Sequence, residues 1–204
     1  MRLLSQAVVL SLVSVVGWGT TLYSNGAISG AIGGSMISGG SEVTDSFVLS
    51  SGASVTAVAN VGIWVLTGDF PVSLSWVIST APDGGGTVEG SGAGVGLGTT
   101  FLETVGSFDI FSASFSTGSL SLSAGTYYLE LFGATSKNSG SVFWDINGGP
   151  STADSNGSPI TSESFEVDGG SVGPVPEPTS VVMSGIGFAA LAGLALLRRR
   201  QFQG

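Results

Sequence analysis

Residues 124–132 read Ala-Gly-Thr-Tyr-Tyr-Leu-Glu-Leu-Phe, a turn of small residues followed by a strand pattern. Tyr127, Leu129 and Leu131 fall on one face, because successive side chains of a strand point to opposite sides of a sheet. Gly125 supplies the backbone freedom that the preceding turn needs. The same alternation occurs in residues 72–79, where one face carries Leu74, Trp76 and Ile78. Both stretches predict half-buried strands of an antiparallel sheet.

Short apolar runs of this kind recur between Gly-rich and Ser-rich turns. They are Asp45–Leu49, Ser54–Leu66, Phe108–Phe115, Ser119–Ser123, Val142–Ile146 and Ser164–Val167. Ser54–Leu66 is either one long strand or two strands that meet near Asn60–Gly62. Residues 24–41 are expected to form a loose leader, and residues 81–98 a long loop or an irregular hairpin. The pattern predicts one all-β domain, a single antiparallel β-sandwich of jelly-roll or immunoglobulin-like type.

The domain is strongly acidic. Residues 20–175 hold thirteen acidic side chains and one cation, Lys137, so their net charge is near −12. Nucleic-acid binding requires clustered Lys and Arg, so we exclude nucleic acid as a partner. Peripheral attachment to anionic lipid is disfavoured for the same reason. The chain also lacks cysteine and histidine, which excludes disulfides, thiolate nucleophiles, His-containing metal sites and Ser-His-Asp triads.

A pair of carboxylates is the remaining catalytic option, since glycoside hydrolases use two of them about 5–10 Å apart in a cleft. The candidates are Glu103, Asp109 and Glu130. They stand beside Ser and Thr, in positions typical of acids that face solvent. We therefore expect a non-catalytic domain and assign no catalytic residue, with a carboxylate-based glycoside hydrolase as an alternative.

Calcium is an alternative to a domain without any cofactor. Asp145, Asn147, Asp154 and Asn156 lie in two Asx-Gly stretches whose oxygens suit this ion. Neither stretch has the spacing of an EF-hand, and Asx-Gly turns explain both without a metal.

A carbohydrate-binding module is a further alternative. Trp64 and Trp144 could present flat aromatic faces to sugar rings, whereas Trp76 shares a face with apolar residues and is expected in the core. The hypothesis requires that a tryptophan is exposed.

The first residues resemble a secretory signal peptide. Arg2 precedes an apolar run within Met1–Val16 that is short for a membrane span, and small residues suited to cleavage occur at Gly17, Gly19 and Ala27. We assign residues 1–27 to the signal peptide and leader, with cleavage near 19 or 27, and residues 28–174 to the β-sandwich domain. A retained N-terminal anchor is the alternative.

Residues 175–204 form a tail in three parts. Pro176, Glu177 and Pro178 make a stiff, extended segment, because each proline fixes φ and disfavours helix in the residue before it. Ser180–Leu197 then runs for eighteen residues without a charge and predicts a transmembrane helix of roughly 27 Å. The cluster that follows stays in the cytoplasm by the positive-inside rule and comprises Arg198, Arg199 and Arg200. A strip of small residues that could receive another helix is formed by Gly185, Ala189 and Gly193.

This order of motif, apolar span and basic cluster resembles the PEP-CTERM sorting signal of Gram-negative bacteria. The resemblance implies export by the secretory translocon and signal peptidase, and single-pass transit through the inner membrane with the domain outside. It further implies processing by an exosortase and a final place at the cell surface or in the extracellular matrix, beside exopolysaccharide or biofilm. The same tail is also catalogued as an ice-binding protein C-terminal domain, a label that describes only the tail.

The domain is similar to the extracellular domains often found ahead of such tails. The shared features are Asp45-x-Phe47-x-Leu49, Leu122-Ser-Ala-Gly-Thr-Tyr-Tyr-Leu129, an aromatic strand with Trp144, and Phe165-Glu-Val-Asp-Gly169. This resemblance implies a fold more than a function.

Overall fold

The computed structural model describes residues 19–31 and 33–171, and these residues are all-β, as predicted. Within these two ranges, no helix is long and apolar enough to cross a membrane. The expected signal-peptide helix in Met1–Val16 and the expected transmembrane helix Ser180–Leu197 lie outside the described residues.

The described chain forms a succession of strands. Their bounds are β1 Thr20–Ser24, β2 Gly34–Met36, β3 Glu42–Leu49, β4 Ala53–Leu66, β5 Pro71–Ser79, β6 Val88–Gly96, β7 Gly98–Val105, β8 Phe108–Leu122, β9 Gly125–Ser136, β10 Val142–Asp145, β11 Ala153–Ser155, β12 Ser158–Ile160 and β13 Glu166–Ser171.

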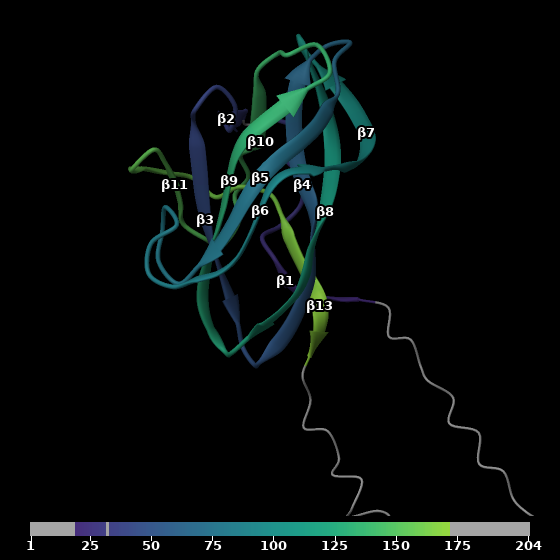
Figure 1. Cartoon of the computed structure of the whole chain (residues 1–204). Helices are drawn as coiled ribbons and strands as arrows, with labels where there is room; N and C mark the ends of the chain where they lie inside the picture. Colours follow the sequence, from purple (N-terminus) through teal and green to yellow (C-terminus); the bar gives the residue numbers. More distant parts are fainter. Residues whose placement is uncertain (1–18, 32, 172–204) are drawn as a thin grey trace, which may run out of the picture. The chain divides into compact units, whose positions relative to one another are not determined.

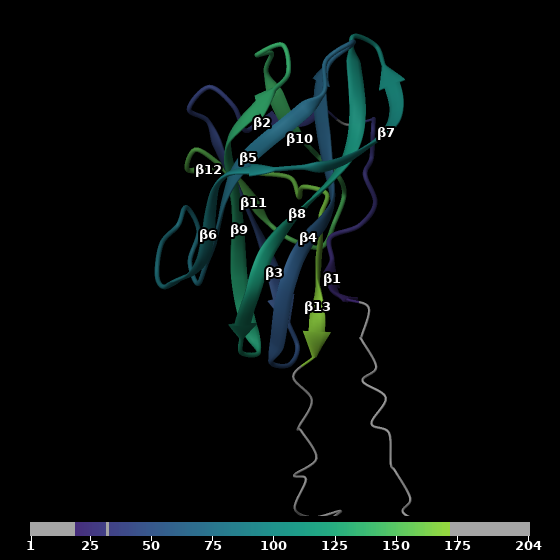
Figure 2. The same cartoon turned by 45° about the vertical axis from the view of Figure 1, so that its right-hand side comes forward.

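These strands form two antiparallel sheets that pack as layers (Figure 1). Sheet A has the order β1-β13-β4-β10-β2, and β8 pairs with β4 on one side and with β7 on the other. Sheet B has the order β12-β11-β3-β9-β5-β6. Figure 2 shows β7 at the outer edge of sheet A, where β8 is its partner among the described strands.

One hydrophobic core lies between the sheets. Tyr127, Leu129 and Leu131 of β9 are buried in it, as are Leu74, Trp76 and Ile78 of β5, so the predicted alternation is confirmed. Full burial of each such aliphatic side chain contributes roughly 1.5–3 kcal/mol. The Tyr127 hydroxyl donates to the Ser123 carbonyl oxygen at 3.1 Å, which fastens the turn before β9 to the strand.

The central strand of sheet A is β4, a single strand rather than two. Its second half is closely covered on the face away from the core. A methyl group on Gly62 would lie 2.5 Å from Asp145 Cβ and 2.5 Å from Ser164 Oγ, so only glycine fits there without displacement of its neighbours.

The glycine-rich residues 81–98 are mostly a hairpin arm and not a loop. Residues 88–96 form β6, which pairs with β5. A β-carbon on Gly92 would lie 2.5 Å from Trp76 Nε1, so the glycines let the strand pass directly over the tryptophan. Of the two expectations, the irregular hairpin is confirmed and the long loop is wrong. A strand of small residues lacks the apolar alternation by which strands are recognised, so its bounds could not be predicted.

The leader is also more ordered than expected. β1 pairs with β13, with Thr20 opposite Gly169, and β2 pairs with β10. The folded domain therefore begins by Thr20 and not at residue 28. A cut at Ala27 would remove a strand of sheet A.

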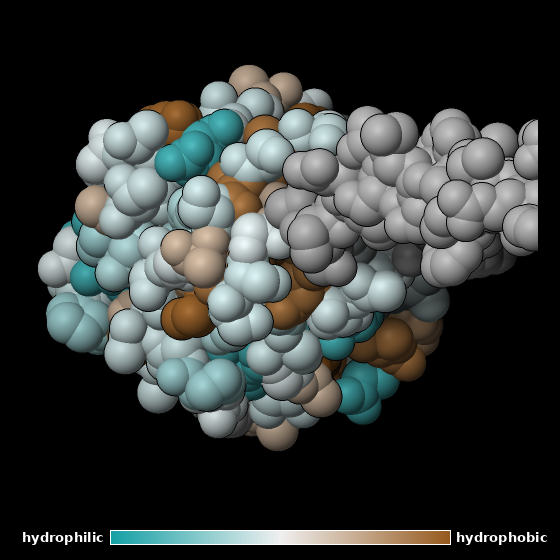
Figure 3. All heavy atoms as spheres, turned by 90° about the horizontal axis from the view of Figure 1, so that it is seen from below, coloured by the Kyte–Doolittle hydropathy of each residue, from teal (hydrophilic) through white to brown (hydrophobic). Residues whose placement is uncertain are grey.

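The two ends of the described domain lie together. β1 starts, and β13 finishes, at the same end of the domain, the lower end in Figures 1 and 2. Seen from below, the visible part of this end is mostly of intermediate hydropathy, with small hydrophobic and hydrophilic areas between (Figure 3). The chain thus enters and leaves the domain on one side.

Candidate functional site

A β-bulge in the middle of β4 places the central residue of the candidate site, Asn60. The register with β8 shifts between Val58 and Val61, and Asn60 within this bulge has a φ of 48°. β13 pairs with β4 as far as Ala59, and β10 takes over from Ile63. Bulges change the direction of a side chain, and Asn tolerates positive φ better than most residues. The bulge therefore turns Asn60 out of the sheet where the two neighbouring strands separate.

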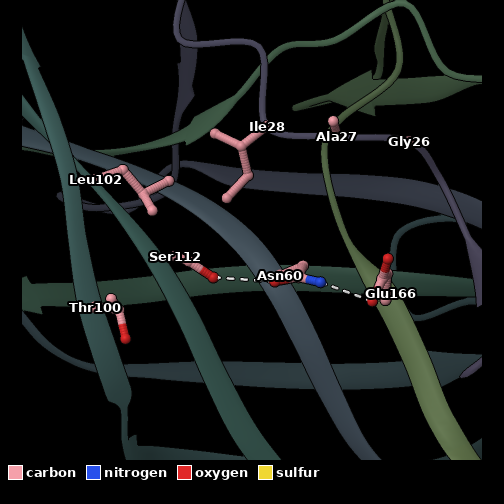
Figure 4. Close-up of a pocket in the computed structure, with 8 residues that line it drawn as sticks. All are labelled: Gly26, Ala27, Ile28, Asn60, Thr100, Leu102, Ser112 and Glu166. Atoms are coloured by element: carbon pink, nitrogen blue, oxygen red, sulfur yellow. Dashed lines mark hydrogen bonds between the residues drawn. The ribbon is translucent and has the colours of Figure 1, made fainter. Parts of the chain in front are cut away.

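Asn60 links its neighbours through side-chain hydrogen bonds (Figure 4). Its Nδ2 donates to Glu166 Oε2 on β13 at 2.7 Å, and its Oδ1 accepts from Ser112 Oγ on β8 at 3.2 Å. Ser24 Oγ on β1 donates to Glu166 Oε1 at 3.2 Å. These four side chains, Ser112, Asn60, Glu166 and Ser24, form a line across four strands that we call the polar row.

Three members of the polar row, Ser112, Asn60 and Glu166, line a groove of about 500 Å³ on the face of sheet A that points away from the core. Thr100 and Leu102 of β7 also line it, as do Gly26, Ala27 and Ile28. Figure 4 shows Leu102 and Ile28 on the same side of the polar row. The groove thus has a polar floor and an apolar flank, and its one ionisable lining group is Glu166.

A second group of polar residues is buried beside the leader. Asp45 Oδ2 accepts from Asn25 Nδ2 at 2.9 Å and from the Glu163 backbone N–H at 2.7 Å. Asn25 Nδ2 also lies 2.6 Å from the Glu163 carbonyl oxygen, and Asn147 Nδ2 donates to the Asn25 carbonyl oxygen at 2.7 Å. We call Asn25, Asp45, Asp145, Asn147 and Glu163 the buried polar cluster. It ties the leader to both sheets.

Asp145 is the member that holds the leader over sheet A. Its carboxylate accepts from the backbone N–H groups of Ser29 at 2.7 Å and Gly30 at 3.2 Å, and from Trp64 Nε1 at 2.7 Å. These donors satisfy both oxygens, so this buried charge serves the packing of residues 25–30.

Glu163 differs from the other acids in the cluster. It is 0% exposed, and neither of its carboxyl oxygens has a hydrogen-bond partner among the described residues. Burial raises its pKa to about 8, although the nearby Ser35 hydroxyl, which is outside hydrogen-bonding geometry, opposes the rise; the carboxyl groups of Asp45 and Asp145 add to it. Burial also raises the pKa of Asp45 to about 6, against the opposing effect of its hydrogen bonds. Glu163 is therefore a neutral, protonated acid at pH 7.

The two tryptophans expected to bind sugar are buried. Trp144 is 0% exposed and its Nε1 donates to the Ser164 carbonyl oxygen at 2.8 Å. Trp64 is 7% exposed, and only a small apolar hollow of about 240 Å³ between Phe108 and Phe143 reaches it. Neither presents a ring face to solvent, because Trp144 belongs to the core and Trp64 packs edge-on against Phe108 with its Nε1 bound to Asp145. The tryptophan platform is thus absent from the described domain.

The four residues suggested for calcium are not brought together. Asp145 and Asn147 belong to the buried polar cluster, whereas Asp154 lies on β11 of sheet B, and Asn156 is exposed at the turn after it. In residues 19–31 and 33–171, no group of three acidic side chains is arranged to hold a metal ion. Asp145 is already satisfied by N–H donors, and Asn156 occupies a turn with a φ of 52°.

The three carboxylates considered for hydrolysis do not form one group. Glu103 and Asp109 lie near each other on the paired strands β7 and β8 of sheet A, whereas Glu130 lies on β9 of sheet B. Asp109 accepts from Thr104 Oγ1 at 2.6 Å and from the Gly68 N–H at 2.8 Å, and these bonds lower its pKa. Burial, with help from Glu42 and Asp83, raises the pKa of Glu130 to about 6.

The predicted sorting residues lie outside the described residues. They are Pro176, Glu177, Pro178, Gly185, Ala189, Gly193, Arg198, Arg199 and Arg200. Their assignment stays a prediction.

The polar row and the buried polar cluster were both missed by sequence reasoning. Each joins residues far apart in the chain, such as Asn60 with Glu166 and Asn25 with Asp45. A faint signal exists for Glu163, an acid just before the apolar run Ser164–Val167. Neither the comparison with protein-family models nor the comparison with curated proteins finds a match for this chain.

Proposed function

We propose that this chain is an exported cell-surface or extracellular-matrix protein whose C-terminal tail is a PEP-CTERM-type sorting signal processed by an exosortase. The observation that carries the proposal is the order of Pro176-Glu177-Pro178, the uncharged run Ser180–Leu197 and the cluster Arg198–Arg200. Such a run is long enough to cross a bilayer, and arginines after it orient the domain outward. Gly185, Ala189 and Gly193 recur at every fourth position, so the membrane enzyme could pack closely against the span.

The arrangement of the domain supports this proposal. The start of β1 and the end of β13 lie side by side, with Thr20 opposite Gly169. Segments before and after the domain can therefore reach the same membrane surface. The high acid content of residues 20–175 suits a solvated exterior and disfavours adhesion to anionic lipid.

We propose that the domain is non-catalytic and of jelly-roll type. In a jelly roll, strands pair in nested fashion and alternate between the two sheets. The pairs β3 with β9, β4 with β8, and β5 with β6 are nested in this way, and they lie in sheets B, A and B. Glu130 lies on the other sheet from Glu103 and Asp109, and the Asp109 carboxylate is held by Thr104 and Gly68; both observations favour a structural or binding role over hydrolysis.

Selective labelling of Lys137 tests the export. It is the one lysine in the sequence, and it is exposed on the domain. A membrane-impermeant amine reagent applied to cells with a permeabilised outer membrane should modify the Lys137 peptide, as read by mass spectrometry. Modification only after lysis of the inner membrane would place the domain in the cytoplasm and refute the proposal.

Replacement of the tail motif tests the sorting. Changing Pro176, Glu177 and Pro178 together to Ala should cause an uncleaved precursor to accumulate, visible as a larger mass. Pro174→Ala, a nearby proline outside the motif, is the matched control and should be processed normally. Equal processing of both variants would show that the processing enzyme does not recognise Pro176-Glu177-Pro178.

A further inference from the structure

We propose that the groove above the polar row binds a neutral carbohydrate chain. The site is separate from the buried Trp64 and Trp144, and it rests on the proposed exposure of the domain outside the cell. Its ligand class follows from three properties of the groove: the spacing of its polar groups, its apolar flank and its charge.

The polar row offers hydrogen-bonding groups at regular intervals. Neighbouring strands of a sheet lie about 4.8 Å apart, so the three members that line the groove, on β8, β4 and β13, extend over about 10 Å. Asn60 uses one of its two N–H hydrogens on Glu166 and one acceptor site on Ser112, and keeps the others free. Glu166 accepts on both oxygens and retains further lone pairs. Such a row of alternating donors and acceptors suits the successive hydroxyl groups of an extended sugar chain.

The internal hydrogen bonds also preorganise the row. Glu166 and Ser112 hold the Asn60 amide from opposite sides, and the bulge fixes its backbone at a φ of 48°. A ligand therefore meets side chains that are already oriented, which lowers the entropic cost of binding.

The flank of the groove provides an apolar contact. Leu102 on β7 is 46% exposed although it is a large aliphatic residue, and Ile28 lies on the same side of the polar row (Figure 4). Sugar rings have apolar C–H faces beside their hydroxyl groups, so a polar floor next to an exposed leucine matches both parts of a ring.

Charge selects a neutral chain over an acidic one. The one ionisable lining group is the Glu166 carboxyl, and Lys137 is the one cation among thirteen acids in residues 20–175. Uronates, phosphates and sulfates would meet like charge without a compensating cation.

Binding is measured on the full chain, purified in a zwitterionic detergent because detergents with sugar headgroups would compete. The probes are short neutral oligosaccharides of glucose, galactose and mannose, with oligogalacturonate and oligoalginate as acidic counterparts, titrated by calorimetry. Binding of at least one neutral probe, and none of the acidic ones, is expected.

Asn60→Gly is the decisive variant, because glycine accepts the positive φ and removes only the amide. The loss of one or two hydrogen bonds should lower the affinity about tenfold. Asn156→Gly is the matched control, since Asn156 is also exposed with a φ of 52° but lies outside the groove. It should bind like the wild type.

Leu102→Ala tests the flank at an exposed position that folding tolerates, and should weaken binding about fivefold. Equal affinity of Asn60→Gly and wild type, preference for the acidic probes, or no binding of any neutral probe overturns the proposal. None of these outcomes affects export, which Lys137 labelling reports independently.

Discussion

Replacement of Glu163 by glutamine should make the domain more stable, and increasingly so as the pH rises. Glutamine keeps the size of the side chain and removes its ionisable proton. In the folded domain the pKa of Glu163 is raised to about 8, against 4.5 for an unperturbed glutamate. Each pKa unit of this difference corresponds to about 1.36 kcal/mol. At a pH where Glu163 is ionised in both the folded and the unfolded chain, it therefore lowers the free energy of unfolding by about 5 kcal/mol.

The sign follows from the proton balance. Below pH 4.5 both the folded and the unfolded chain keep the Glu163 proton, so the residue does not affect the free energy of unfolding. Between pH 4.5 and about 8 only the unfolded chain loses the proton, and the free energy of unfolding falls as pH rises. Above about pH 8 the cost is constant. The difference between Glu163→Gln and wild type should therefore grow by about 3 to 4 kcal/mol from pH 5 to pH 8.

Urea denaturation at several pH values, followed by the fluorescence of the buried tryptophans, measures this difference. Glu130 titrates in both proteins and cancels, so the difference reports Glu163 together with its electrostatic coupling to Asp45. Glu103→Gln, at an exposed position on β7, is the control and should change the free energy of unfolding by less than about 0.5 kcal/mol at every pH. A difference between Glu163→Gln and wild type that does not vary with pH would refute the idea that Glu163 is a buried, protonated acid.

Three further substitutions test the packing, each by urea denaturation at pH 7. Gly62→Ala should destabilise the domain by about 1–3 kcal/mol, because its new methyl group meets the Asp145 side chain; a change under about 0.5 kcal/mol would contradict the close approach. Asn25→Ala should cost about 2–4 kcal/mol, since it leaves Asp45 without one of its donors in a buried site; stability equal to wild type would show that the leader is dispensable. Tyr127→Phe should lower the free energy of unfolding by about 1 kcal/mol, because the hydroxyl hydrogen bond is lost. An unchanged urea midpoint would show that this bond does not stabilise the domain.

The parts of the fold that sequence predicted well are those with local periodicity. β5 and β9 were recognised because apolar side chains alternate along them, and this pattern is a direct record of which face is buried. β3, β4 and the start of β8 were located for the same reason. β6 was anticipated only as one arm of an irregular hairpin, because its glycines show no apolar alternation, and its position depends on the surface of Trp76 against which it lies.

The candidate site was beyond the reach of sequence reasoning for a different reason. The polar row joins Ser24, Asn60, Ser112 and Glu166, and no spacing rule connects residues so far apart in the chain. Aromatic content pointed instead to Trp64 and Trp144, whose burial depends on the residues that the folded domain packs around them. Exposure is a property of the assembled layers, so residue type alone could not separate a sugar platform from a core.

Alternating side chains, the absence of helical periodicity and the lack of cysteine and histidine were enough to predict an all-β domain without disulfides, because these are properties of single segments or of composition. The tail was readable for the same reason, as its span, motif and charges are contiguous. The groove, the protonated Glu163 and the ordered leader became visible only in three dimensions. They arise where strands distant in sequence meet, and the burial and hydrogen bonding that define them do not exist until the sheets have closed on each other.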